Sequence, residues 1–141
     1  MTVATAVAVP DVEIVSYGHL HGPSPEGLHI DLDLRRHFRD PHRVSPQMRE
    51  MTGRDLAVSR LVLDTPGIPE LLRATALQVL AFRAGPSAGP VRVGVSCAGG
   101  KHRAAAVALA LPGHIRAAHQ GEDDLVVTVA HRDIDRPVVH R

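Results

Sequence analysis

The segment from Cys97 to Arg103 carries the residues whose types and spacing point most directly to chemistry. Two adjacent glycines, Gly99 and Gly100, indicate a tight loop, and three cationic or ionisable side chains follow them. Such a loop can bind a tetrahedral oxyanion, because the first N–H groups of a helix lack internal partners and the helix dipole is positive there. The sequence therefore predicts a phosphate-binding loop formed by Cys97, Ala98, Gly99, Gly100, Lys101, His102 and Arg103.

The spacing Cys97-x5-Arg103 also has an enzymatic interpretation. Cysteine-dependent phosphatases need a thiolate at the base of a loop whose amides and arginine hold the phosphoryl group. Two observations favour binding without catalysis: Ala104 stands where a hydroxyl-bearing residue is usual, and the sequence shows no aspartate loop for a general acid. No catalytic residue is assigned, and a phosphatase using Cys97 and Arg103 remains the alternative.

A strand before this loop and a helix after it must position these residues. Alternating valines predict a β-strand over 91–96, and an alanine-rich run favours a helix after Arg103. Because proline removes a backbone donor and clashes with the preceding turn, Pro112 is expected to kink or split that helix near Leu111.

A second polar group is expected at the end of another strand. Residues 28–34 alternate between apolar and polar, which predicts a half-buried strand with Asp31 and Asp33 on its polar side. Binding sites in α/β proteins lie at the carboxyl ends of strands. The basic stretch after this strand, Arg35 to Arg43, could therefore equally line a ligand cleft or form a solvated loop. The predicted ligand-binding residues are Asp33, Arg35, His42, His131 and Arg132.

The basic stretch supports another class of function, and nearby histidines support a third. Its residues Arg35, Arg36, Arg39 and Arg43 could bind the backbone of an RNA, which would make affinity fall steeply with salt. His19 and His21, with His29, Asp31 and Asp33 close behind, have spacings found among metal ligands. With 10 histidines in the chain, chance pairing is easy, so no metal and no cofactor are assigned.

The remaining pattern defines the fold class. Strands over 12–17 and 125–130 and a helix over 67–83 are expected, whereas 56–63 fits either a short helix or a strand. Strands that alternate with helices predict an α/β fold: a single small domain with a mixed or mostly parallel sheet flanked by helices. The expected divisions are a flexible N-terminal leader (1–10), the domain (11–136) and a C-terminal tail (137–141).

Composition limits the partners. The 141 residues suit one core, and a formal net charge of +1 gives no general attraction to polyanions. Aromatic residues make up 2%, which argues against base-stacking surfaces for single-stranded nucleic acid. One cysteine cannot form an internal disulfide, and no apolar run reaches membrane-spanning length, so a cytoplasmic protein that makes no membrane contact is expected.

Five motifs in order resemble the C-terminal domain of the RNase adapter protein RapZ family. The segment SCAGGKHRAAAVA is similar to that family's GCTGGxHRS loop. Four further segments resemble its SFGFKxG, DVRFLPNPH, LRxxTGxD and VRHRDL motifs: Ser16–His19 with Gly22, Asp33-x-Arg35 with Asp40–His42, Met48–Gly53 with Asp55, and Val129–Asp133. Together they cover residues 12 to about 136.

This resemblance implies a ligand and a role. Members of the family bind glucosamine-6-phosphate and regulate its synthesis, in some bacteria by presenting small RNAs to a ribonuclease. The resemblance implies that Ala98, Gly99, Gly100, His102 and Arg103 hold the phosphate, that Asp33, Arg35 and His42 line the sugar side, and that Cys97 is not a nucleophile. It leaves room for an RNA or regulatory protein partner and for a homodimer.

Departures from the family pattern limit what carries over. Longer members have an N-terminal kinase-like domain with a Walker motif, and no G-x-x-x-x-G-K-[ST] occurs in this sequence. Ala98 replaces a threonine, so that one hydroxyl donor is lost, and Ala104 replaces a serine. The family's basic RNA-binding tail is hardly recognisable in IDRPVVHR.

Overall fold

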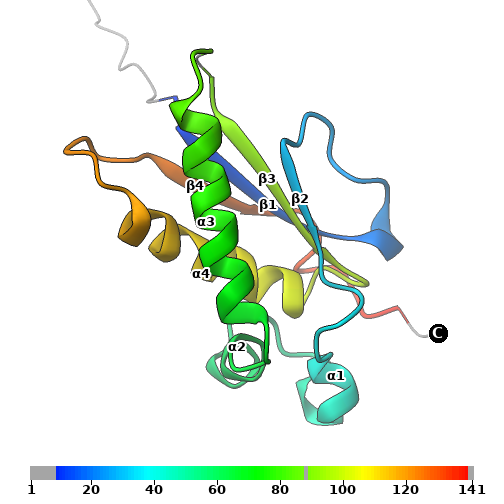
Figure 1. Ribbon diagram of the computed structural model, residues 1–141. Helices are drawn as coiled ribbons and strands as arrows, with labels where there is room; N and C mark the ends of the chain where they lie inside the picture. The colour runs from blue at the N-terminus through cyan, green and yellow to red at the C-terminus, as the bar shows by residue number, and fades with distance from the viewer. Residues whose placement is uncertain (1–8, 88, 140–141) are drawn as a thin grey trace, which may run out of the picture.

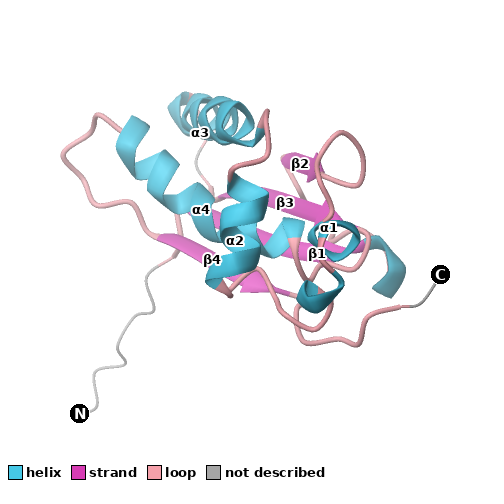
Figure 2. Cartoon of the chain, turned by 90° about the horizontal axis from the view of Figure 1, so that it is seen from below, coloured by secondary structure: helices cyan, strands magenta, loops and turns pink. Residues whose placement is uncertain are grey.

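The computed structural model describes residues 9–87 and 89–139 as a two-layer α/β arrangement (Figures 1 and 2). Four strands form one sheet in the order β2-β3-β1-β4, and every neighbouring pair is parallel. The strands are β1 (Val12–Gly18), β2 (Ile30–Asp33), β3 (Val91–Cys97) and β4 (Val127–His131). The predicted α/β class is confirmed, and the sheet is wholly parallel. Most of the predicted leader, residues 1–8, lies outside the described part.

The longer helices lie together on one face of the sheet (Figure 2). They are α2 (Leu56–Leu63), α3 (Ile68–Ala84) and α4 (Arg103–Ala118), and shorter turns of helix are α1 (Pro41–Val44), η1 (His19–His21) and η2 (Pro46–Met48). The ambiguous segment 56–63 is thus a helix, and α1 and η2 lie in the arginine-rich stretch, where no clear period was found.

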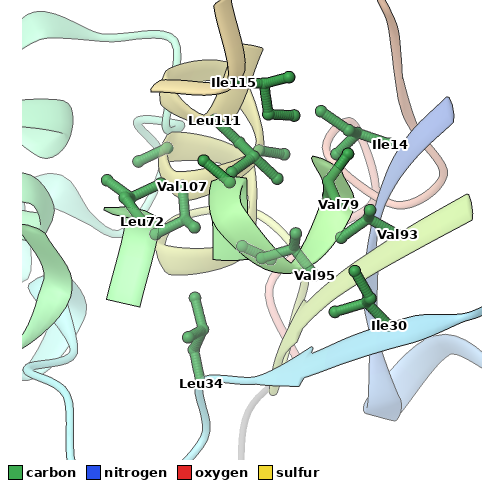
Figure 3. Packing of buried hydrophobic residues seen from close by; sticks show 14 of the residues in the cluster. Ile14, Ile30, Leu34, Leu72, Val79, Val93, Val95, Val107, Leu111 and Ile115 are labelled. Atoms are coloured by element: carbon green, nitrogen blue, oxygen red, sulfur yellow. The ribbon is translucent and has the colours of Figure 1, made fainter. Parts of the chain in front are cut away.

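The core lies between the sheet and these helices. Val12 and Ile14 of β1 and Val93 and Val95 of β3 alternate toward the helices and are almost completely buried. They meet residues of α3 and α4, among them Leu72, Val79, Val107, Leu111 and Ile115 (Figure 3). Burial of these aliphatic side chains, each worth about 1.5–3 kcal/mol, holds the two layers together.

Pro112 does not split α4. The helix runs as one element from Arg103 to Ala118, so the predicted split near Leu111 is wrong, and the other expected outcome, a kink, stays a prediction. Leu111 and Ile115, on either side of the proline, are both fully buried against the core. Their burial favours a continuous helix despite the donor that proline lacks.

Two strands differ from prediction at their ends. β2 is shorter than the predicted 28–34, because Leu28 belongs to the preceding connection, where its Cδ1 lies over Gly94. β4 begins at Val127 instead of 125 and extends to His131. Because all four strands are parallel, Gly18, Asp33, Cys97 and His131 come to the same edge of the sheet.

Among the described residues, no helix combines the length and the apolar character needed to cross a bilayer.

Candidate phosphate-binding site

The glycine loop joins the end of β3 to the start of α4 and packs directly on the end of β1. Gly100 has a φ of 73°, in the left-handed region, and a Cβ there would lie 2.6 Å from the Gly18 nitrogen. In turn, a Cβ on Gly18 would lie 2.2 Å from the Gly99 carbonyl carbon. The glycines at 18 and 100 are therefore required by close backbone approach and not only by flexibility.

The main chain of this loop offers several open donors. The N–H of Gly100 donates to Cys97 Sγ at 3.2 Å, so this donor is used internally. Within the described part of the chain, the N–H groups of Gly99, Lys101 and His102 have no acceptor. His102, which precedes α4, also makes no side-chain capping bond. These free N–H groups lie just before a 16-residue helix, at the end where the helix dipole is positive.

Arg103 is buried and already hydrogen-bonded to the protein. Its Nη1 donates to the carbonyls of Leu34 and Arg35 at 2.9 and 3.2 Å, and Nη2 lies 3.6 Å from a carboxylate oxygen of Asp40. The buried Nε–H has no acceptor. Arg103 thus ties the start of α4 to the segment after β2, and only Nε remains a donor in need of a partner.

His102 and Lys101 differ in availability. His102 Nε2 lies 2.9 and 3.1 Å from the carbonyls of Met48 and Arg49, so this nitrogen carries the proton and donates. Burial lowers the pKa of His102, which favours the neutral ring. Among the described residues, the Lys101 ammonium has one carboxylate neighbour, Glu50 at 3.8 Å. Lys101 is therefore the cation of the loop that is freer to meet an anion.

A small cavity, called here the loop cavity, opens beside these groups. Its volume is about 50 Å³, room for an anion or a few waters but too little for a whole sugar phosphate. The glycine loop lines this cavity together with Leu20, His21 and the C-terminal residues Arg136, Pro137, Val138 and Val139. Residues 137–139 of the predicted tail thus lie against the loop.

A second cavity of about 220 Å³, called the arginine cavity, adjoins the first. Asp40, Ala98 and Arg103 line both cavities. The remaining wall consists of Arg35, Phe38 and Arg43. The structure therefore brings Arg35 beside the loop, as the sequence analysis expected for the sugar side.

The other predicted ligand residues lie in different surroundings. Asp33 accepts four hydrogen bonds from the main chain and side chain of Arg35, the shortest of 2.7 Å, and these lower the pKa of Asp33 to about 2. His131 Nδ1 lies 2.6 Å from the Ser16 hydroxyl, and burial lowers the pKa of this histidine. The side chain of His42 lies outside the described part of the structure.

Arg132 holds the β1–β2 connection instead of facing a cavity. It donates to carbonyls of that connection at Gly22 and Pro23, and its guanidinium lies 5.2 Å from the centre of the Tyr17 ring. Neither Arg132 nor His131 lines the loop cavity or the arginine cavity.

Two of the three histidines considered as metal ligands have other partners. His19 Nε2 lies 2.9 Å from the Ser96 hydroxyl, and His29 Nδ1 accepts the N–H of Arg92 at 2.9 Å. Over residues 9–87 and 89–139, no three His, Cys, Asp or Glu side chains form a group suited to a metal ion.

Three residues of the site were not predicted as such. Asp40 lines both cavities and pairs with Arg103. Arg43 was expected only as a member of the basic stretch that could line a ligand cleft or bind RNA, and not as a ligand residue of its own. Gly53 packs on the loop, donating its N–H to the Lys101 carbonyl at 2.8 Å, and a Cβ there would lie 2.4 Å from the Ala106 nitrogen. In the sequence, the only indication of this close contact is the glycine at the end of the motif Met48–Gly53.

Comparison with known proteins identifies the family of the chain. Residues 10–135 match the family described as RapZ C-terminal domain. The chain is 36% identical over 138 residues to a nucleotide-binding protein of Mycobacterium avium (strain 104), with 93% of this chain and 44% of that protein covered. The corresponding protein of Mycolicibacterium paratuberculosis is 37% identical, and that of Acidothermus cellulolyticus is 36% identical. The chain spans less than half the length of these relatives. With the family match extending over nearly all of its residues, the chain belongs to the RapZ C-terminal domain family.

Proposed function

We propose that this domain binds a phosphorylated small metabolite and acts as a sensor, not as an enzyme. The observation that supports this most directly is the set of unpartnered N–H groups at Gly99, Lys101 and His102 beside the loop cavity. An oxyanion there would satisfy those donors, would lie near the Lys101 ammonium and would face the start of α4. A phosphoryl group fits the loop cavity, and the body of the ligand would occupy the arginine cavity.

An amino-sugar phosphate, glucosamine-6-phosphate, is the candidate that the family resemblance supplies. Arg35 and Asp33 would lie on the sugar side in this proposal, and Arg103 would act mainly by holding the segment after β2 in place. The regulatory role, with an RNA or a protein as the partner downstream, belongs to the same proposal. Because the relatives are named nucleotide-binding proteins, a nucleoside triphosphate must be tested alongside the sugar phosphate.

Titration calorimetry tests the proposal with inorganic phosphate, glucosamine-6-phosphate, glucosamine and GTP. Phosphate and the sugar phosphate should bind saturably, and glucosamine should not. Lys101→Gln should weaken binding of phosphorylated ligands roughly tenfold, a typical loss for one charge-assisted contact. Arg116→Gln, an exposed change near the far end of α4, is the matched control. The absence of saturable binding to any phosphorylated ligand would refute the proposal.

The phosphatase alternative has little structural support. Cys97 is 3% exposed, belongs to the core cluster, and its sulfur accepts the N–H of Gly100. Hydrolysis of an aryl phosphate by the native protein, abolished in Cys97→Ser, would nevertheless establish it.

RNA binding is a second candidate because Arg36 and Arg39 are exposed on the segment after β2. Neutralising both should lower RNA affinity and reduce its dependence on salt. RNA binding that is unchanged in the double variant would remove this candidate.

A further inference from the structure

Asp40 is the one acidic residue, within the described part of the chain, that lines either cavity of the candidate site. It lines both of them, so its side chain lies where the loop cavity and the arginine cavity adjoin. The other charged residues around the two cavities are arginines and Lys101. Because a carboxylate repels a nearby phosphate, an acid at this place is unfavourable for a ligand that carries only negative charge.

Asp40 is held in a defined position that solvent still reaches. Its main-chain carbonyl accepts the N–H groups of Arg43 and Val44 at 3.1 and 3.2 Å, at the start of α1. Its side chain is 17% exposed, and one carboxylate oxygen lies 3.6 Å from Nη2 of Arg103. That distance exceeds the roughly 2.7–2.9 Å of a charge-assisted hydrogen bond, so Arg103 attracts the carboxylate mainly through its charge. A carboxylate has about four lone-pair sites and can contact two cations together.

Asp33 is engaged in a different way. All four hydrogen bonds that it accepts from Arg35 include the main chain and the guanidinium, and Asp33 lines neither cavity. A ligand ammonium at Asp33 would have to displace that guanidinium. At Asp40 an ammonium could approach from the cavities while Arg103 kept its bonds to the Leu34 and Arg35 carbonyls.

We propose that Asp40 binds the ammonium group of the ligand and thereby selects an amino-sugar phosphate over the matching neutral sugar phosphate, an inference that rests on the proposed function. The phosphoryl group would lie in the loop cavity and the sugar in the arginine cavity, with Asp40 at their junction. An ammonium there would offset the repulsion between the carboxylate and the phosphoryl group. The family motif DVRFLPNPH has asparagine where the resemblance puts Asp40, so this chain carries a charge that the motif lacks.

Calorimetry at about pH 7 tests this role with glucosamine-6-phosphate, glucose-6-phosphate and N-acetylglucosamine-6-phosphate. These ligands share the phosphate and the ring and differ in carrying an ammonium, a hydroxyl or a neutral acetamide. The native protein should bind glucosamine-6-phosphate roughly five- to tenfold more tightly than the other two, the scale of one partly exposed ion pair. Asp40→Asn, which removes the charge but little of the volume, should reduce this preference to about twofold or less.

Two further measurements make the test specific. Glu50→Gln removes a carboxylate near Lys101 that lines neither cavity; it can change the affinity for every phosphorylated ligand but should keep the preference. With the native protein, the preference should also disappear at about pH 9.5, above the pKa of about 8 typical of an amine of this kind. This second measurement needs no variant, so it decides the matter even where Asp40→Asn fails to fold.

The outcomes separate the role of Asp40 from the function on which it rests. Equal binding of the three ligands by the native protein, or a preference that survives both Asp40→Asn and high pH, overturns the role of Asp40 and leaves sugar-phosphate binding intact. If none of the three ligands binds, both proposals fail.

Discussion

Asp133 accepts the main-chain N–H of Gly18 at 2.8 Å, across 115 residues of sequence. The carboxylate is fully buried at the end of β4, and Arg132 also donates to the same oxygen. Its other oxygen lies 3.0 Å from Arg136 Nε. Burial alone would raise the pKa of Asp133, but the hydrogen bonds from Arg132 and Gly18 outweigh it and the pKa falls below its ordinary value. Because Gly18 supports the glycine loop, this bond links β4 to the candidate site.

Asp133→Ala should therefore destabilise the domain and weaken phosphate binding together. This substitution removes the buried carboxylate that accepts from the Gly18 N–H and pairs with two arginines. The free energy of unfolding should fall by about 3 kcal/mol. Urea unfolding and calorimetry measure the two effects. Asp133→Asn keeps an acceptor and should lose less stability. Equal stability of Asp133→Ala and native protein would show that the bond is unimportant.

The two glycines of the loop should respond differently to alanine. Gly100→Ala puts a Cβ on a residue with φ of 73° and within 2.6 Å of the Gly18 nitrogen, so about 2 kcal/mol or more of stability should be lost. Gly99→Ala meets no atom within 4 Å and is the matched control, with an expected change of under about 1 kcal/mol. Denaturant midpoints decide the comparison, and equal losses would contradict the close packing.

Arg103→Lys should cost more than its conservative appearance suggests. A lysine ammonium cannot reproduce the planar set of bonds to the Leu34 and Arg35 carbonyls together with the approach to Asp40. We expect a loss of about 2–4 kcal/mol, since buried acceptors and Asp40 lose their partner. Arg43→Gln, on the surface of the same cavity, should change stability by no more than about 0.5 kcal/mol. Thermal melts of the two variants provide the measurement.

Stability should fall as the pH is lowered from about 7.5 to 5.5. The pKa of His102 and that of His131 are both lowered by burial, so the unfolded chain binds more protons than the folded one in this range. The free energy of unfolding therefore rises with pH, by at most about 1.4 kcal/mol per pH unit for each histidine, and the contribution is complete above the unfolded pKa near 6.5. His102→Gln, which keeps a donor for the Met48 carbonyl, should reduce the slope. An unchanged slope would show that His102 does not contribute.

The sequence was informative where local pattern and structure coincide. Alternating valines predicted β3, the spacing of apolar residues predicted α3, and the glycine pair predicted the turn before α4. The contacts of Arg103 could not be foreseen, because they join it to carbonyls almost 70 residues away. His131 and Arg132 were expected to contact the ligand because they lie at the end of a strand. In the structure, His131 is hydrogen-bonded to Ser16, and Arg132 donates to the β1–β2 connection. Strand-end position alone does not specify where a side chain points.

The wall that Pro137, Val138 and Val139 contribute to the loop cavity has a thermodynamic consequence. About 50 Å³ admits an oxyanion. A ligand whose bulk lay on the side of these three residues would have to displace them. Ligand occupancy and the position of the C-terminal segment are then coupled equilibria. By thermodynamic reciprocity, a molecule that binds the displaced segment raises the affinity of the domain for the metabolite by some factor. The metabolite then raises the affinity of the domain for that molecule by the same factor. Metabolite binding and exposure of the C-terminal segment would thus depend on the same conformational equilibrium.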